Sequence, residues 1–257
     1  MLLACAGQEE RASEHRETPA NSGPLASATP APPVAPESTA LATTGATLSG
    51  KVTFEGEPPP RKEVNMDADP FCRQAQPGPA YVQSVELNSN GTIKNAFVYI
   101  KEGVTGSYAV PTKAVILNQR GCQFSPHVFG VQVGQLLTIV NSDETYHNIH
   151  ALPRNNPEFN IGQPSAGFHT TKQFTVAEVP IRLTCDLHPW MVSYAGVLPH
   201  PYSSVTNDEG NFEIKGVLPG NYVIAAWQEK YGLRTQRVTV SGEETKTVTF
   251  AFSRGQP

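Results

Sequence analysis

Short stretches in which apolar and polar residues alternate recur along the chain from Thr47 onward. In the first, LSGKVTF, the residues Leu48, Gly50, Val52 and Phe54 alternate with polar residues. Later stretches of strand length are NAFVYIKEG, AVILN, VFGVQV, LLTIVN, QFTV, PIRLTC, YAGVL, NFEIKGV, NYVIAAW, QRVTV and TKTVTFAF. Turn signals such as Asn90-Gly91 and Pro219-Gly220 separate them, and no amphipathic helix of 12 residues is apparent after Thr47. Short strands at this spacing predict an all-β protein made of sandwiches or barrels.

Residues 1–46 have a different composition. Between Ala6 and Ala46 the residues are mainly Ala, Pro, Ser, Thr and Glu, and large apolar side chains are almost absent. Such a segment buries too little surface to offset its ordering entropy, so we expect a disordered tether that its prolines extend.

The start of the chain, MLLAC, resembles the lipobox of bacterial lipoproteins, with Leu2, Leu3 and Ala4 directly before Cys5. The resemblance implies that Cys5 is lipidated and that the protein is exported. It would then lie in the periplasm or at the cell surface and contact the membrane only through this lipid. The alternative is a free cysteine near a disordered end.

The charge balance narrows the range of partners. Charged residues make up 16% of the chain and the net charge is -4, without the basic surplus of a nucleic-acid-binding protein. The 39% of hydrophobic residues suffices for a core, yet they form no run long enough to span a membrane as a helix.

A group of candidate metal ligands stands in TCDLHPWM, where Cys185, His188 and Met191 have the spacing C-x2-H-x2-M. A thiolate, an imidazole and a thioether form a ligand set that suits copper, whereas zinc sites rarely use a thioether. A trigonal His2Cys copper site with an axial Met needs one more histidine. His147, in the upstream stretch VNSDETYHNIHA, is available for this role.

Together these motifs resemble the cupredoxins, the blue type 1 copper proteins, and among them the short ligand loop of the amicyanins. The resemblance extends over about residues 113–201 and predicts a Greek-key β-sandwich that holds one copper ion. It implies equatorial ligands at His147, Cys185 and His188 and an axial ligand at Met191. It also implies that Asn148 hydrogen-bonds to the backbone beside the ligand loop and holds the two loops together.

The remaining cysteines, Cys72 and Cys122, are more readily paired than free if the protein is exported. We therefore expect a disulfide between them, and two buried free thiols are the alternative. Among the other histidines, His150 is expected beside the site or on the surface. His127, His169 and His200 show no pattern that indicates chemistry.

The C-terminal stretch VTNDEGNFEIKGVLPGNYVIAAW resembles the carboxypeptidase regulatory-like domain, a small transthyretin-like sandwich. LSGKVTFEGEPP and NGTIKNAFVYI resemble the first half of the same family. We therefore predict one sandwich from residues 47–112 and 203–253, with a copper domain of residues 113–202 inserted between them. The rival arrangement is an N-terminal extension of the copper domain followed by a separate C-terminal module. No histidine has Glu three residues later, so the HxxE pair of zinc carboxypeptidases is absent.

The leading functional hypothesis is a monomeric one-electron carrier of the bacterial cell envelope rather than an enzyme. Its expected partner is an exported redox protein such as a c-type cytochrome, which would dock over Pro189, Trp190 and an exposed edge of His188. The stretch 113–202 has zero net charge, so steering by charge should be weak. Its charged residues are Lys113, Arg120, Arg154, Lys172, Arg182, Asp143, Glu144, Glu158, Glu178 and Asp186.

Three other functions stay open at this stage. One is a tethered copper store or donor, another is a subunit of an oxidase or reductase, and the last is an adhesion module in which copper is secondary. The sequence around Cys185 lacks the HCH arrangement of multicopper enzymes. It also lacks the second loop cysteine that a copper-A site needs.

Overall fold

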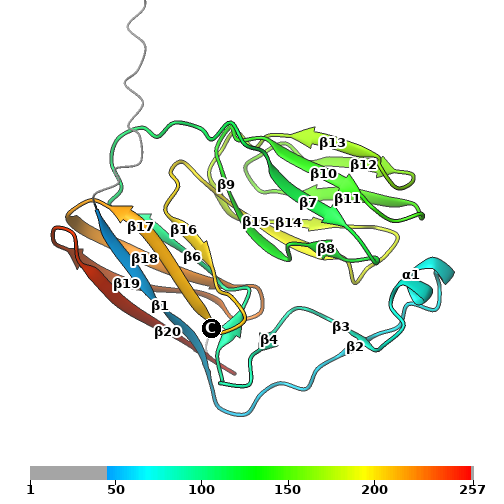
Figure 1. Ribbon diagram of the computed structural model, residues 1–257, viewed down its shortest axis with the longest axis horizontal. Coiled ribbons are helices and arrows are strands. Elements are labelled where there is room, and N and C mark those ends of the chain that lie inside the picture. Colours follow the sequence, from blue (N-terminus) through cyan, green and yellow to red (C-terminus); the bar gives the residue numbers. More distant parts are fainter. Residues whose placement is uncertain (1–44, 256–257) are drawn as a thin grey trace, which may run out of the picture. The chain divides into compact units, whose positions relative to one another are not determined.

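The computed structural model describes residues 45–255, so Cys5 and nearly all of the predicted tether lie outside the described residues. The described chain consists of β-strands and a single short helix (Figure 1). The prediction of an all-β fold built from sandwiches is confirmed. Among the described residues, no helix is both long and apolar enough to cross a membrane.

Strands from both ends of the described chain form one sandwich, which we call the flanking sandwich. Its first sheet has the order β17 (Asn211–Val217), β1 (Ala46–Glu55), β20 (Thr245–Ser253). Its second sheet has the order β16 (Ser203–Val205), β6 (Phe97–Glu102), β18 (Gly220–Gln228), β19 (Gly232–Val240). Strands that precede residue 103 and strands that follow residue 202 therefore hydrogen-bond to each other in both sheets.

The alternation in the sequence decides which side chains enter the core of the flanking sandwich. Leu48 and Val52 of β1 are fully buried, and Val248, Phe250 and Phe252 of β20 are buried with them. Gly50 of β1 is paired with Val248 of β20, and a Cβ atom at Gly50 would stand 1.7 Å from the carbonyl oxygen of Val248. Only glycine fits this position without a shift of the backbone.

The middle of the chain forms a second sandwich, which we call the central sandwich. Its first sheet has the order β13 (His169–Lys172), β10 (Leu137–Asn141), β7 (Val115–Gln119), β8 (Phe124–Ser125). Its second sheet has the order β12 (Phe159–Gln163), β11 (His147–Leu152), β14 (Glu178–Thr184), β15 (Val192–Leu198), β9 (Val128–Gln132). Buried aliphatic residues of the two sheets, such as Leu117 and Ile139 against Ile149 and Leu183, form one core.

The strand predicted at QFTV is wrong, because residues 173–176 form no strand. The backbone N–H groups of Thr175 and Val176 both donate to the side-chain oxygen of Asn156, at 2.9 and 3.0 Å. Phe174 alone of this stretch is buried. A side-chain amide thus takes the hydrogen bonds that a neighbouring strand would otherwise accept.

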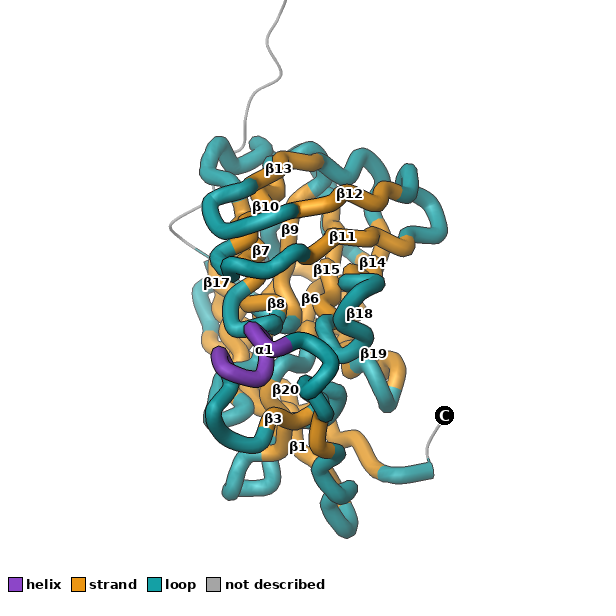
Figure 2. The backbone as a smooth tube through the Cα atoms, turned by 90° about the vertical axis from the view of Figure 1, so that its right-hand side faces the viewer, coloured by secondary structure: helices purple, strands orange, loops and turns teal. Residues whose placement is uncertain are grey.

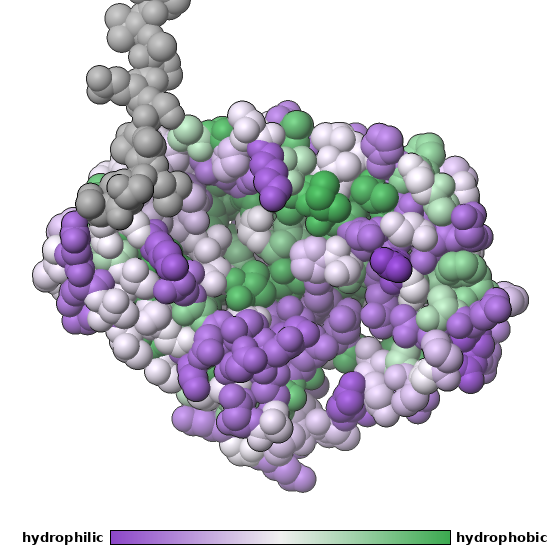
Figure 3. Space-filling model, in the orientation of Figure 1, coloured by the Kyte–Doolittle hydropathy of each residue, from purple (hydrophilic) through white to green (hydrophobic). Residues whose placement is uncertain are grey.

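The two sandwiches pack against each other through aromatic residues. Phe97 of β6 lies over Gly130 and Gly196, which are paired across β9 and β15. A Cβ atom at Gly196 would approach the Phe97 ring to 2.2 Å, so larger residues would displace this ring. His127 also bonds to Glu229 across the contact, at 2.7 Å, and both side chains are nearly buried. On the face shown in Figure 3, hydrophobic residues gather near the middle, among hydrophilic ones.

The segment between β1 and β6 contains the helix and four short strands. They are β2 (Glu63–Val64), α1 (Pro70–Ala75), β3 (Ala80–Tyr81), β4 (Glu86–Leu87) and β5 (Ile93–Lys94). The helix is drawn in purple in Figure 2. Met66 and Cys72 of this segment belong to the core of the central sandwich. Ile93 instead belongs to the core of the flanking sandwich, with Val85 and Leu87 packed against that core, so the segment contributes to both sandwiches.

Candidate metal centre

The loop between β14 and β15 carries three of the predicted ligands. The backbone N–H of Cys185 donates to the carbonyl of Met191 at 3.2 Å, and the N–H of Met191 donates to the carbonyl of His188 at 2.8 Å. These two bonds close the loop tightly, so the spacing C-x2-H-x2-M brings its side chains together at the end of the sheet.

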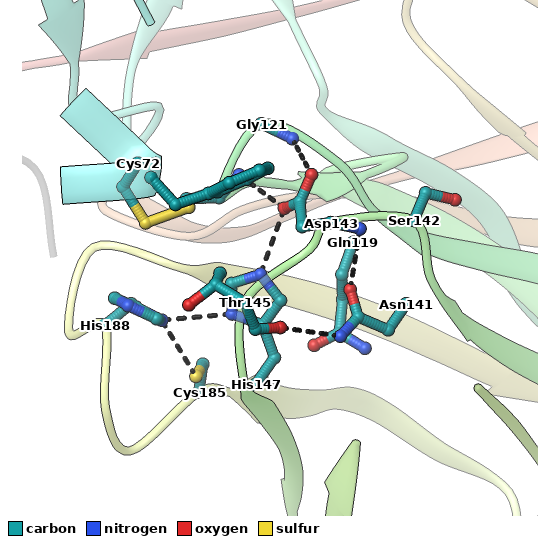
Figure 4. A network of polar contacts seen from close by, with 12 residues as sticks. Cys72, Gln119, Gly121, Asn141, Ser142, Asp143, Thr145, His147, Cys185 and His188 are labelled. Carbon is teal, nitrogen blue, oxygen red and sulfur yellow. Dashed lines mark hydrogen bonds and ion pairs between the residues drawn. A yellow bond between two sulfur atoms is a disulfide. The ribbon is translucent and has the colours of Figure 1, made fainter. Parts of the chain in front are cut away.

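The fourth predicted ligand reaches the loop because β11 and β14 are neighbours in the sheet. His147 is the first residue of β11, and its Nδ1 lies 3.0 Å from Nδ1 of His188. The sulfur of Cys185 lies 3.6 Å from the same His188 nitrogen. One candidate ligand atom from each of these residues lies within 4.8 Å of the others, and all three residues are buried (Figure 4).

Met191 and Asn148 complete the predicted set. Met191 is 1% exposed and belongs to the same core cluster as Cys185. The side-chain oxygen of Asn148 accepts a hydrogen bond from the backbone N–H of Asp186 at 2.7 Å. Asn148 therefore ties β11 to the ligand loop, the contact that the resemblance implies.

Asp143 holds the far side of the His147 ring. Its Oδ2 lies 3.0 Å from Nε2 of His147 and accepts the backbone N–H of Cys122 at 2.8 Å. Its other oxygen accepts the N–H of Gly121 at 2.7 Å. Asp143 is only 3% exposed, so these hydrogen bonds replace the contacts with water that its carboxylate loses on burial.

Asp69 holds the far side of the His188 ring in the same way. Its Oδ2 lies 3.0 Å from Nε2 of His188 and accepts the hydroxyl of Thr145 at 3.0 Å. Its Oδ1 accepts the backbone N–H groups of Phe71 and Cys72, so Asp69 is also the N-cap of α1. A disulfide joins Cys72 to Cys122, which binds α1 to the turn that Asp143 holds.

This arrangement suits a metal ion. When the Nε2–H group of each histidine donates a hydrogen bond to a carboxylate, the neutral ring presents a lone pair at Nδ1. Two such lone pairs and the sulfur of Cys185 then converge in a buried space, where a cation would stabilise them. Histidines that bind metals usually donate their other N–H to a carboxylate or carbonyl. Two imidazoles and a thiolate, with a thioether in the same loop, suit copper.

The same contacts shift the pKa values of Cys185 and His147. Burial by itself would raise the pKa of the Cys185 thiol, but hydrogen bonds from His147 and His188 lower it to about 6. Burial would lower the pKa of His147, but its bonds to Asp143 and Cys185 raise it to about 9. The site without metal thus favours a thiolate beside a protonated imidazole, a charge distribution that a bound cation can replace.

One expectation about the site is wrong. The edge of His188 is not exposed, because Asp69 covers its Nε2 atom and the residue is only 5% exposed. Trp190 is half-buried, with its indole N–H donating to the carbonyl of Cys122 at 3.0 Å. The exposed residues of the loop are Pro189, Asp186 and Leu187, the last at 55%.

The other histidines lie outside this cluster. His150 bonds to Asp186 and Glu158 through its two ring nitrogens, at 3.0 and 2.9 Å, beside the site and near the surface. His127 is more than an ordinary histidine, since it forms the contact with Glu229 between the sandwiches. His200 is buried and His169 is exposed.

The sequence analysis missed Asp69 and Asp143 as partners of the ligands. Asp143 could have been found, because it stands four residues before His147 in the same polar turn. The sequence Asp69-Pro70 is a helix N-cap signal but gives no indication of a contact with a residue 119 positions away.

Comparisons with known proteins give limited matches. The family model for the second β-sandwich domain of the NOMO1-like subunit of the BOS complex matches residues 200–252. No curated protein matches the chain.

Solved structures that match include a copper-containing nitrite reductase from Thermus scotoductus SA-01, with 22% identity and a TM-score of 0.32 over 38% of this chain. The match spans 25% of that reductase. A purple cupredoxin from Nitrosopumilus maritimus has 22% identity over 32% of this chain and 98% of its own, with a TM-score of 0.29. A Cu(I) amicyanin variant has 19% identity over 39% of this chain and 97% of its own, with a TM-score of 0.30.

Proposed function

We propose that this protein is a type 1 (blue) copper protein that carries single electrons in the bacterial cell envelope, and that it is not an enzyme. One observation carries the proposal. Two histidine nitrogens and a cysteine sulfur converge in a buried space, and a carboxylate holds the outer nitrogen of each histidine.

In the proposed site His147, Cys185 and His188 hold one copper ion, with Met191 as a weak axial ligand. The metal supplies a Cu(I)/Cu(II) couple when it is bound. The protein residues fix the two imidazoles through Asp143 and Asp69, keep the sulfur away from water, and hold the loops together through Asn148. A rigid, dry ligand set of this kind changes little between two oxidation states, which suits electron transfer.

The proposed location is the periplasm or the cell surface, with Cys5 as the lipid anchor. The disulfide between Cys72 and Cys122 supports an oxidising compartment. We further propose that the central sandwich is an inserted copper domain and that the flanking sandwich is a carboxypeptidase regulatory-like domain. The strand pairing of β1 with β17 and β20 supports the insertion.

The visible spectrum of the copper-loaded full chain tests the function. We expect one copper per chain and an intense blue absorption from charge transfer between Cys185 and Cu(II). Cys185→Ser should abolish the colour, and the control His150→Ala should keep it, because His150 faces Asp186 and Glu158 instead of the site. A colour that survives in Cys185→Ser would refute the site, and a colourless copper protein would favour copper storage.

Met191 should tune the site more than it holds the metal, because an axial thioether is a long and weak ligand. Met191→Gln is therefore expected to keep copper and to lower the reduction potential. Complete loss of copper from a folded Met191→Gln protein would show that the ligands are ranked wrongly.

The proposed partner is an exported redox protein such as a c-type cytochrome, docking on the ligand loop around Pro189 and Trp190. Because the edge of His188 is covered, the exposed contact residues there are Pro189 and Leu187. Leu187→Asp should slow electron transfer from a reduced cytochrome in stopped-flow mixing without changing the copper spectrum. Leu136→Asp is the control, because Leu136 is also exposed and directly precedes the first residue of β10, at the end of this strand away from the metal centre. This variant should leave the rate of electron transfer unchanged. Equal rates in the parent protein, Leu187→Asp and Leu136→Asp would show that the docking surface lies elsewhere.

A further inference from the structure

The segment that covers the candidate metal centre lies outside the central sandwich in sequence but is built into the site. Asp69 stands at the N-terminus of α1 and uses all of its acceptor capacity on four donors. These are the backbone N–H groups of Phe71 and Cys72, the hydroxyl of Thr145 and Nε2 of His188. Its side chain is 20% exposed, so the contact with His188 is partly shielded from water.

The position of Asp69 is fixed by a closed ring of contacts. Cys72 donates to Asp69 and is joined by the disulfide to Cys122. Cys122 in turn donates its backbone N–H to Asp143, which holds His147. The ring closes through His147 and His188, whose Nδ1 atoms lie 3.0 Å apart. A further bond runs from the Gln76 side chain to the carbonyl of Gly121 at 3.0 Å.

We propose that Asp69 is a positioning residue for His188 that biases the metal site toward its oxidised state, and that the Cys72–Cys122 disulfide holds Asp69 in place. The inference rests on the proposed function and deepens it, because it assigns the control of the copper couple to a residue outside the ligand motif.

The physical reason is electrostatic. A carboxylate that accepts the outer N–H of a ligand imidazole makes that imidazole a stronger donor to the metal. Its negative charge also stabilises the higher charge of Cu(II) more than that of Cu(I), and burial weakens the screening of this interaction. Loss of the charge at Asp69 should therefore raise the reduction potential.

A matched pair of variants in the full chain tests this. Asp69→Asn removes one charge and keeps the side-chain size, whereas Asp67→Asn removes the same charge two residues away. Asp67 is 72% exposed and pairs with Arg73 at the surface. We expect Asp69→Asn to lower the ratio of Cu(II) to Cu(I) affinity at least tenfold, which is 59 mV for a one-electron couple. Asp67→Asn should change the ratio less than twofold. Equal ratios in Asp69→Asn and Asp67→Asn would overturn the proposal.

A second measurement needs no variant. In the diamagnetic Cu(I) protein, the proton on Nε2 of His188 should exchange slowly with solvent, because Asp69 accepts it. A proton that exchanges as fast as that of an exposed histidine would overturn the contact with Asp69. A chain that gives no blue copper complex at all would instead refute the proposed function, so the two failures are distinguishable.

The role of the disulfide is tested in a double-variant cycle. In the Cys72→Ala/Cys122→Ala background, Asp69→Asn should change the affinity ratio less than threefold, because Asp69 is then no longer held against His188. An undiminished tenfold change in that background would show that the disulfide does not hold Asp69.

Discussion

The two histidines of the candidate metal centre are held by carboxylates of different origin. Asp143 lies in the turn before β11, four residues before His147, the first residue of that strand, and both are buried. Asp69 and His188 lie 119 residues apart, and Asp69 retains some exposure. The first pair is fixed by the local chain, whereas the second depends on how α1 is held against the central sandwich. We call Asp143 and His147 the inner pair, and Asp69 and His188 the outer pair. We infer from this difference that the inner pair is needed to form the site, whereas the outer pair adjusts its properties.

The largest expected effect comes from removing the disulfide, which links the outer pair to the inner one. In Cys72→Ala/Cys122→Ala, the free energy of unfolding should fall by about 4 kcal/mol, because a loop of 50 residues is released in the unfolded state. Urea unfolding of the variant and the parent protein measures the loss. A loss below about 1 kcal/mol would contradict this loop-closure estimate.

The next largest effect is expected at the inner carboxylate. Asp143→Ala leaves the N–H groups of Gly121 and Cys122 and the His147 ring without their acceptor, in a buried place. Each such group costs about 1–3 kcal/mol, so a loss of about 3 kcal/mol in unfolding free energy is expected. Thermal or urea unfolding of the copper-free protein measures it. Asn at the same position should recover part of the loss, because its side-chain oxygen still accepts.

A smaller effect is expected at the outer carboxylate. Asp69→Ala should cost about 1 kcal/mol, because it removes the N-cap of a short helix and a partly exposed contact. The unfolding free energies of Asp69→Ala and Asp143→Ala, measured under the same conditions, rank the two pairs by their contribution to stability. If Asp69→Ala were the more destabilising of the two, the distinction between a building pair and an adjusting pair would be wrong.

The smallest effect concerns the copper-free thiol. The pKa of Cys185, lowered to about 6, should appear in the pH dependence of its ultraviolet thiolate absorbance. Because this pKa is below that of an unfolded thiol, the thiolate contributes stability at alkaline pH that is lost as pH falls through about 6. Asp143→Asn should raise the pKa of Cys185 more than Asp69→Asn does, because Asp143 and His147 are more deeply buried than Asp69 and His188. Equal shifts in both variants would indicate that the two histidines act alike.

Much of the fold could be predicted from local patterns. The strands near Leu48, Ile139 and Phe250 follow the alternation of apolar residues, because a half-buried strand must present one face to the core. The strand β11 was less apparent, because His147, Asn148 and His150 interrupt its apolar pattern. QFTV failed for the opposite reason, since its pattern suits a strand but Asn156 takes its backbone donors.

The ligand loop could be predicted from the sequence alone. Cys185, His188 and Met191 are close in the chain, and two backbone hydrogen bonds suffice to gather them. The sequence also indicated His147. This residue needs only the pairing of β11 with β14 to reach the loop. The residues that cover the loop become apparent in the folded chain. Asp69 reaches His188 through the packing of Met66 and Cys72 into a core formed by later residues, and contacts between such distant segments leave no periodic signal in the chain.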